Sequence, residues 1–295
     1  MTNLGDLVIL NKFPRKSHSK TRLGRQLDNI ALEIDEQEEE DKPRFNGYEE
    51  SAKLAQLLLD DVVNAALPVC DVTIACPNYD ADDLKKEYPN LSIYGGSESL
   101  IARPLKWVKD THTKKKLEKV VIMTGDVVVK TQEVESWFNH LDKYKFLFGP
   151  TIGGMFYNNY MIGFNKEIVK YFAAEESNFK NFPYGRVIGW SRIAYLISYL
   201  TGEFAYNKLK FWEKNRWEDL REKSIKRLQE KILGKNIKTL PGKIDIDTIN
   251  DLYDVLNSGD MLPGKTRDHA QKLMDYVKKN TKPGFFNFID RMTYR

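Results

Sequence analysis

The pattern of apolar and polar residues over the first 130 positions predicts strands that alternate with helices. Short apolar runs bounded by polar residues or glycine are typical of buried strands, and apolar residues that recur every three or four positions are typical of amphipathic helices. Strands are predicted at 7–10, 69–76, 91–94 and 120–123, and helices at 21–32, 48–66, 82–87 and 99–111. This alternation predicts an α/β fold with a mixed, mainly parallel sheet, helices on both faces and strand 120–123 at its centre.

The second half of the chain continues the pattern with more helix. Strands are predicted at 146–150, 157–164 and 243–248, and helices at 136–144, 166–174, 188–200, 216–233, 250–256 and 268–279. The segment 284–289 contains three phenylalanines. We expect this segment to pack on the rest of the chain, because aromatic side chains are seldom left in water.

Composition restricts the class of protein. Of the 295 residues, 41% are hydrophobic and 30% are charged, which indicates a soluble globular chain. No apolar run approaches the ~18 residues of a membrane span, and the first six residues lack the features of a signal peptide. Cys70 and Cys76 flank a predicted strand, so we expect neither a disulfide nor a zinc site. These features favour a cytoplasmic protein with no membrane partner.

Charge is distributed unevenly along the chain. The 46 basic and 42 acidic residues give a net charge of +4, but residues 33–41 contain seven acids and no base. The remaining 46 basic and 35 acidic residues give +11. A basic body suits a polyanionic ligand such as a nucleotide, a sugar phosphate or a nucleic acid. The acidic segment, taken as 33–43, is predicted to be a mobile, solvated loop.

The loop after the first strand is the most basic part of the chain. Between Asp6 and Asp28 there are six Lys or Arg residues and no acid. A basic loop at the carboxyl end of a first parallel strand is where α/β folds bind nucleotide phosphates. The glycine-rich motifs of dinucleotide folds and P-loops are absent, so Lys and Arg side chains would have to bind the phosphates. The alternative is an exposed basic turn without function.

A set of motifs in this chain resembles the MobA-like nucleotidyltransferase superfamily. Residues 12–15 (Lys-Phe-Pro-Arg) and 20–23 (Lys-Thr-Arg-Leu) resemble its K-x-P-x-x-G-x-x-K-T-R-L opening, and 120–126 resembles its V-V-L-I-G-[ST]-D segment. Further matches follow in the same order at 96–103, 149–154, 160–164, 182–187 and 245–252. The similarity is greatest to the bacterial glycosyltransferase-like branch and to the phospholactate guanylyltransferases.

The resemblance implies a GT-A fold over residues 1–256, with residues 257–295 as a C-terminal helix and aromatic tail that pack on it. It also implies a metal-dependent transferase that uses a nucleotide donor. Departures from the motifs concern mainly the acceptor side: the opening glycine is absent, Ile152 replaces an acid, and Val128 replaces a proline. The acceptor is therefore not inferred from the family, and a non-catalytic member remains an alternative.

Carboxylates in two of these motifs are the candidate metal ligands. Asp126 ends the predicted central strand, and we expect it to be catalytic and to bind Mg²⁺ or Mn²⁺, with Asp247 as a second ligand. A turn or helix-capping role is the alternative for Asp126. Strand alternation places Asp245 on the same face as Asp247, but Asp245 and Asp251 rank lower, and a capping role for Asp251 is equally good.

Basic residues are the candidate phosphate ligands. Lys20 is the second predicted catalytic residue, because transfer of a nucleotidyl or sugar group develops negative charge on phosphate. The residues expected to bind the donor phosphates are Lys12, Arg15, Lys20, Arg22 and Arg103.

Three functions follow from these features. The leading one is nucleotidyl transfer from an NTP to a phosphorylated or sugar acceptor. The second is glycosyl transfer from a nucleotide sugar, disfavoured because Asp126 is not part of a D-x-D motif. The third is nucleic-acid binding by the basic segment 216–231 with Trp212 and Trp217, whose interspersed acids make a solvated face the better interpretation. A small-molecule acceptor is therefore favoured over a nucleic acid, and the sequence gives no indication of oligomeric state.

Overall fold

The computed structural model describes residues 3–16, 19–35, 45–97, 102–152, 159–174, 236–258 and 262–281. Its strands are β1 (Asp6–Leu10), β2 (Asp71–Pro77), β3 (Ser92–Gly96), β4 (Val120–Thr124), β5 (Phe146–Ile152), β6 (Asn159–Phe164), β7 (Ile237–Thr239) and β8 (Lys243–Ile244). Its helices are α1 (Thr21–Asp35), α2 (Gly47–Ala66), η1 (Asn78–Asp80), α3 (Ala81–Glu87), α4 (Ala102–His112), α5 (Thr131–His140), α6 (Lys166–Ala174), α9 (Ile249–Asn257) and α10 (Gly264–Asn280).

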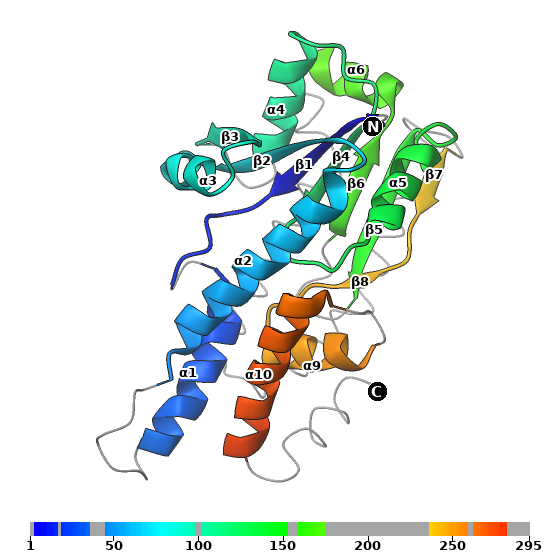
Figure 1. Ribbon diagram of the computed structural model, residues 1–295. Helices are drawn as coiled ribbons and strands as arrows, with labels where there is room; N and C mark the ends of the chain where they lie inside the picture. The colour runs from blue at the N-terminus through cyan, green and yellow to red at the C-terminus, as the bar shows by residue number, and fades with distance from the viewer. Residues whose placement is uncertain are drawn as a thin grey trace, which may run out of the picture.

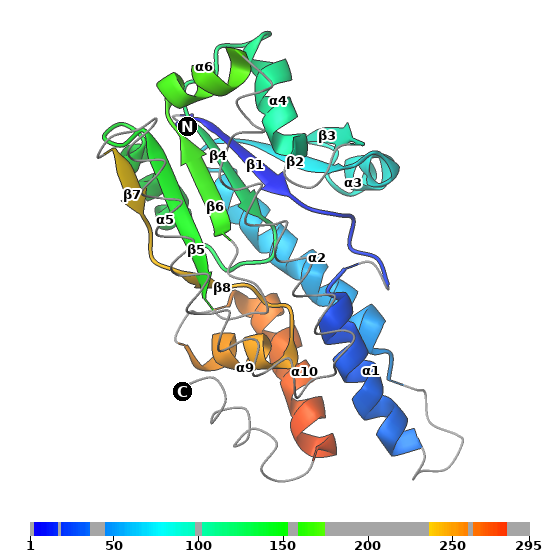
Figure 2. The same cartoon turned by 180° about the vertical axis from the view of Figure 1, so that it is seen from behind.

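These strands form one mixed sheet in the order β3-β2-β1-β4-β6-β5-β7, and β8 pairs with β5 (Figures 1 and 2). Strand β1 lies between β2 and β4 and is parallel to both, and β2 is parallel to β3. Strand β6 is antiparallel to β4 and β5, while β7 and β8 are parallel to β5. The sheet is therefore mainly parallel with β4 in its middle, as the sequence predicts.

A layer of helices covers each face of the sheet. Successive side chains along a strand point alternately to the two faces, so they pack against different layers. Leu7 and Ile9 of β1 belong to the apolar cluster that includes α2 and α5, whereas Val8 belongs to the cluster of α4 and α6. Strand β4 alternates in the same way. Figure 1 shows α2 and α5 on one face and α4 and α6 on the other. Burial on both faces explains why these strands are continuous apolar runs.

A third apolar cluster lies beyond the carboxyl ends of the parallel strands (Figure 1). It is built by α1, the first half of α2, α9 and α10. Three of its fully buried residues are Leu23 on α1, Leu273 on α10, and Ile246 on the segment between β8 and α9. Thr266 of α10 also donates a hydrogen bond to Asp61 of α2. The C-terminal helix predicted from the sequence therefore packs against the body of the chain, and the domain boundary at 256 stays a prediction.

Three local predictions are corrected, and one strand was not predicted. Helix α5 begins at Thr131 rather than 136, because Glu133 accepts a hydrogen bond from the Lys130 backbone and stabilises the first turn, and it ends at His140. The predicted strand 243–248 is reduced to two residues, because only Lys243 and Ile244 pair with β5. Strand β7 was not predicted, since it is only three residues long. Helix α1 continues through Asp35, so the acidic segment begins within a helix.

Several predictions concern residues outside the described ranges. These are the helices at 188–200 and 216–233, the rest of the acidic segment at 36–43, and the aromatic segment 284–289. Within the described ranges, Cys70 and Cys76 are buried free thiols, as expected. Burial raises the pKa of Cys70 to about 12 and that of Cys76 to about 11. None of the helices in these ranges combines the length and apolar character that a bilayer span requires.

Candidate functional site

The candidate site lies where the strand order reverses. From β1 the chain proceeds outward to β2 and β3, and then returns to place β4 on the other side of β1. In open α/β sheets, the crevice at the carboxyl ends of two such strands is the usual ligand site. Asn11 follows β1 there and Asp126 follows β4. Gly125 allows the turn after β4 to lie close to the end of β1. A Cβ at position 125 would lie only 3.3 Å from the Asn11 side chain and 3.2 Å from that of Ile9.

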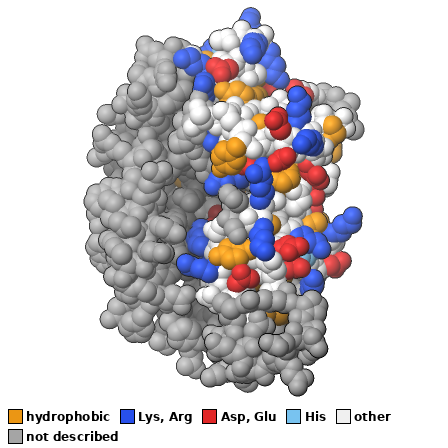
Figure 3. Space-filling model, turned by 90° about the vertical axis from the view of Figure 1, so that its left-hand side faces the viewer, with side chains coloured by type: hydrophobic (Ala, Val, Ile, Leu, Met, Phe, Trp, Pro, Cys, Tyr) orange, Lys and Arg blue, Asp and Glu red, His pale blue; other side chains and the backbone are white. Residues whose placement is uncertain are grey.

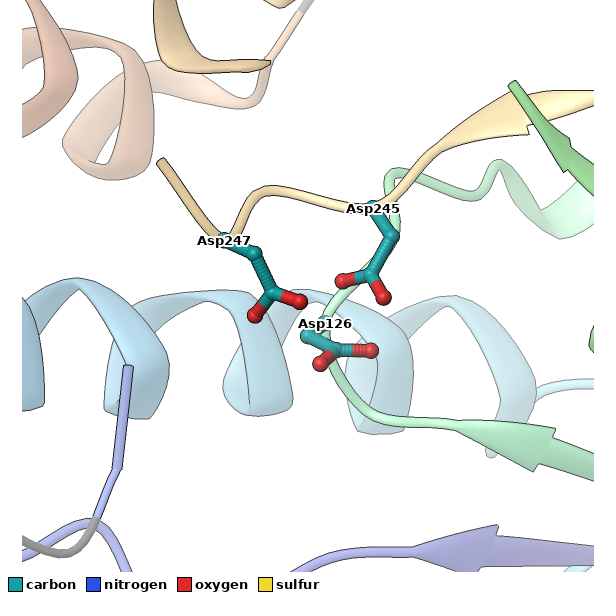
Figure 4. Close-up of side chains that lie close together, drawn as sticks. All are labelled: Asp126, Asp245 and Asp247. Carbon is teal, nitrogen blue, oxygen red and sulfur yellow. The ribbon is translucent and has the colours of Figure 1, made fainter. Parts of the chain in front are cut away.

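Three aspartates converge at this point and are called the carboxylate triad: Asp126, Asp245 and Asp247. One oxygen of each lies within 4.8 Å of the others. Figure 4 shows the carboxylates turned toward one another, with Asp126 on the turn after β4 and the other two on the segment after β8. Ile246, between them, is fully buried in the third apolar cluster. Burial of Ile246 on one side of the segment directs Asp245 and Asp247 to the other, so both reach the site.

A capping interaction fixes the end of this segment. Thr248 is the N-cap of α9, and its side chain accepts a hydrogen bond from the Asp251 backbone. The Asp251 carboxylate in turn accepts hydrogen bonds from the Thr248 hydroxyl at 2.7 Å and from the Asp247 backbone at 3.1 Å. Of the two roles left open for Asp251, the structure shows the capping role. This carboxylate thereby positions the backbone of Asp247.

Lys20 is inserted into the triad. Its Nζ lies 2.9 Å from Asp126 Oδ2, 3.4 Å from Asp245 Oδ1 and 3.5 Å from Asp247 Oδ1. Only 4% of its side chain is exposed. Lys20 directly precedes α1 and has a φ of 49°, in the left-handed region. This conformation costs on the order of 1–3 kcal/mol in a non-glycine residue and tends to occur at functional sites.

Arg22, in the first turn of α1, provides the second cation of the site. It forms an ion pair with Asp247 through Nη2. Its Nη1 is buried and has no hydrogen-bond partner among the described residues, and the same holds for Asn11 Nδ2, Thr124 Oγ1 and Asp126 Oδ1. Buried polar atoms are rarely left unpaired, so this group indicates a place for a polar ligand.

Burial and the neighbouring charges shift the pKa values of Lys20, Asp126 and Asp245 in different directions. Burial raises the pKa of Asp245 well above its usual value, and the neighbouring Asp126 charge raises it further. Burial also disfavours ionised Asp126, but the Lys20 charge and hydrogen bonds to the carboxylate together outweigh burial and lower the pKa of Asp126. Burial disfavours the Lys20 ammonium, yet the three carboxylates together raise the pKa of Lys20. Lys20 is therefore firmly charged, while Asp245 gains a proton more readily than a solvated aspartate.

The triad fits a hard divalent cation. Its three carboxylates are the oxygen ligands that Mg²⁺ and Mn²⁺ prefer. Asp126 Oδ1, buried and unpartnered among the described residues, is available to a cation. The structure thus brings together Asp126 and Asp247, the two predicted metal ligands, and adds Asp245, which the sequence ranked lower.

The predicted phosphate ligands separate into two groups. Lys20 and Arg22 reach the triad, but Arg15 pairs with Asp80 at 3.3 Å and with Asp83 of α3. Arg103 is buried on α4 and donates to the Gly96 carbonyl at the end of β3, 3.2 Å away. Lys12 is exposed on the loop after β1. Lys20 and Arg22 are therefore the two of the five candidates that lie at the triad, and phosphate binding by Lys12, Arg15 and Arg103 stays a prediction.

Sequence reasoning missed two residues at the site. Asn11 and Thr124 stand at the carboxyl ends of β1 and β4, the two strands that flank the reversal of strand order. The same strand-end argument that selected Asp126 would have selected them. Both are uncharged. Asn11 lies just before the opening motif, and Thr124 lies within the 120–126 motif, where only Asp126 was selected.

Nucleic-acid binding was the third function that the sequence suggested, through a basic surface. Figure 3 shows Lys and Arg side chains interspersed with Asp and Glu on the described part of one face. A mixed distribution of charge is not the single-sign patch expected of a nucleic-acid interface. The basic segment 216–231 lies outside the described residues, so this alternative stays an untested prediction.

Comparison with known proteins gives matches in structure and none in sequence. No protein family and no curated protein matches the sequence. A Desulfovibrio desulfuricans G20 protein described as a nucleotide-diphospho-sugar transferase matches with a TM-score of 0.61 and 16% identity, over 96% of this chain and 100% of that chain. A cytidylyltransferase from Leptospira borgpetersenii serovar Hardjo-bovis has 16% identity and a TM-score of 0.42, over 94% of each chain.

At this level of identity the likeness establishes the fold. The first of these structures matches along nearly the whole of both chains. The chain therefore has the same fold as this nucleotide-diphospho-sugar transferase. This confirms the α/β fold of GT-A type, with a mixed, mainly parallel sheet, that the sequence predicts.

Proposed function

We propose that this protein is a metal-dependent transferase that uses a nucleotide donor, and that it transfers a nucleotidyl group from an NTP to a phosphorylated or sugar acceptor. The observation that carries the proposal is the convergence of the carboxylate triad with Lys20 and Arg22 at the reversal of strand order. Carboxylates for a cation and cations for phosphate are the two requirements of phosphoryl chemistry. Here both are met within one cluster of side chains.

Each group has a defined task under this proposal. Asp126, Asp245 and Asp247 would hold a divalent cation, which when bound supplies Lewis-acid stabilisation of charge on the donor phosphates. Lys20 and Arg22 bind and orient those phosphates, Arg22 through the guanidinium edge that Asp247 leaves free. Asn11 and Thr124 offer buried polar atoms to the donor. Asp251 keeps Asp247 in position.

Glycosyl transfer from a nucleotide sugar is the second candidate, and one observation favours it. The sequence argument against it was the missing D-x-D motif at Asp126. Asp245-Ile246-Asp247 has this spacing, and both of its carboxylates reach the same site as Asp126. The two reactions are separated by their products, since nucleotidyl transfer releases pyrophosphate and glycosyl transfer releases a nucleoside diphosphate.

Thermal unfolding with candidate donors tests the proposal. Each NTP and common nucleotide sugar is added with Mg²⁺, and a true donor at about 100 times its dissociation constant stabilises the fold by roughly 2.7 kcal/mol. Asp126→Asn should lose this response. Asp142→Asn is the matched control, because Asp142 forms its ion pair with Lys119 in a solvated turn after α5. Equal responses in the two variants would contradict the proposed site.

A further inference from the structure

We infer that the Lys20 ammonium group is an exchangeable internal cation: it occupies the carboxylate triad until a polyanionic donor draws it away, so metal and donor bind cooperatively. The inference rests on the proposed function and concerns the regulation of the same site. It assigns to Lys20 a role beyond phosphate binding, that of controlling when the triad accepts metal.

The position of Lys20 Nζ is the first argument. It lies within 3.5 Å of one oxygen from each of the three carboxylates. A cation that bound the same three oxygens would have to share or take this position. The Lys20 side chain is almost completely buried, so the ammonium has exchanged its water shell for the triad.

Charge is the second argument. The triad carries three potential negative charges, and Lys20 and Arg22 supply two positive ones. With Lys20 in place, a divalent ion would meet a like charge among its own ligands. Without Lys20, the triad would hold the same ion with no such repulsion. Arg22 does not interfere in this way, because among the described residues its ion pair within the triad is with Asp247.

The position of Lys20 in the chain explains what would move it. Lys20 directly precedes the first turn of α1, and its carbonyl accepts a hydrogen bond from the Gly24 backbone N–H. The buried Nη1 of Arg22 is in the same turn and has no partner among the described residues. A phosphate that bound Arg22 there would lie beside the flexible Lys20 stem, and the ammonium would turn from carboxylate to phosphate.

Thermodynamic linkage then relates the affinity of the site for metal to its affinity for the polyanion. If a polyanion removes Lys20 from the triad, it raises the affinity for metal, and metal must raise the affinity for the polyanion by the same factor. Metal alone must compete with the Lys20 ammonium for the triad, with no phosphate present to receive that ammonium. The site therefore accumulates metal mainly in the presence of donor.

Binding of Mn²⁺, followed by electron paramagnetic resonance, tests the inference without any assay of turnover. Lys20→Met should bind Mn²⁺ about tenfold or more tightly than the wild type, within the usual range of coupling between sites. Lys20→Arg keeps the charge and should remain weak. Lys115→Met is the matched control, because Lys115 also bridges two carboxylates, Asp6 and Asp71, at the other end of β1.

Pyrophosphate provides the polyanion arm of the test, with the Mn²⁺ that it binds in buffer measured separately. Pyrophosphate should raise the Mn²⁺ affinity of the wild type and change that of Lys20→Met little. Equal affinities of the wild type and Lys20→Met, with no binding by Asp126→Asn, would overturn the inference and leave the metal site standing. Absence of Mn²⁺ binding in all three would overturn the proposed function as well.

Discussion

At each end of strand β1 a lysine bridges carboxylates, and the two clusters differ in the number of carboxylates and in the exposure of the lysine. At its amino end, Lys115 joins Asp6 to Asp71, which face each other as register partners on β1 and β2. At its carboxyl end, Lys20 joins the carboxylate triad. The Lys115 side chain is 48% exposed and the Lys20 side chain 4%.

The difference separates a cluster that stabilises the fold from a cluster with the features of a ligand site. The Lys115 cluster neutralises two like charges across neighbouring strands, in contact with water. The Lys20 cluster is buried, combines a left-handed backbone with unpaired polar atoms, and holds more acid than base. Strain and excess charge of this kind lower stability and are retained where a ligand compensates for them.

The largest expected effect comes from Asp126→Asn. A neutral amide loses the charge that attracts Mg²⁺, and removal of a preorganised charge at a phosphoryl centre costs at least ~3 kcal/mol of barrier. Turnover with the donor identified by thermal shift should fall by about a hundredfold or more. Since Asn suits a turn, the melting temperature should change little.

The same substitution at the other end of β1 is the control. Asp71→Asn should leave turnover unchanged, because Asp71 lies in the Lys115 cluster. Asp245→Asn and Asp247→Asn should resemble Asp126→Asn. Wild-type turnover in any triad variant would remove that residue from the metal site.

Lys115→Met should have a smaller effect, and on stability alone. Without the ammonium, Asp6 and Asp71 repel each other across the strand pair, and we expect a loss of about 1 kcal/mol. For a chain of this length that corresponds to a fall in melting temperature of roughly 2–4 °C. The thermal response to nucleotide and Mg²⁺ should persist. Its disappearance would show that the two ends of β1 are energetically coupled.

The smallest effect concerns the pH dependence of Asp6. Burial raises the pKa of Asp6 above its usual value of 3.8, although Lys115 opposes the shift. A raised pKa in the folded state stabilises the fold while Asp6 is protonated, and this contribution is lost as the pH rises through that pKa. Asp6→Asn has no proton to lose. The melting temperature of this variant should therefore rise relative to that of the wild type as the pH increases above 3.8, the usual pKa of Asp. A difference that stays constant with pH would contradict the shift.

Local patterns predicted much of this fold because both faces of the sheet are buried. Strands such as β4 are continuous apolar runs, and helices such as α2 carry a regular apolar stripe. Strand β7 escaped prediction, since three residues at the sheet edge have no periodicity to detect. The extent of β8 depends on its pairing with β5, and the sequence of 243–248 contains no sign of where that pairing stops.

The type of site could be predicted from the sequence, but the full set of residues that form it could not. Asp126 and Lys20 stand at strand and helix ends, so local reasoning selected them. Asp245 ranked below Asp247, although strand alternation places the two on the same face. Only the burial of Ile246 in the third apolar cluster shows that both turn into the site. The pairing of Arg15 with Asp80 and Asp83 is a long-range contact that no local pattern encodes.

The burial of Ile246 also has a consequence for when the protein becomes competent during its synthesis. Lys20 and Asp245 are 225 residues apart, so the triad closes one of the longest loops in the chain. A nascent chain that has emerged only as far as β8 already contains Lys20 and Asp126, but neither of the other two carboxylates. Those are anchored when Ile246 enters its cluster with α9 and α10. A chain that ends at β8 thus carries one of the three triad carboxylates, and the proposed metal site stays incomplete until the C-terminal helices have folded.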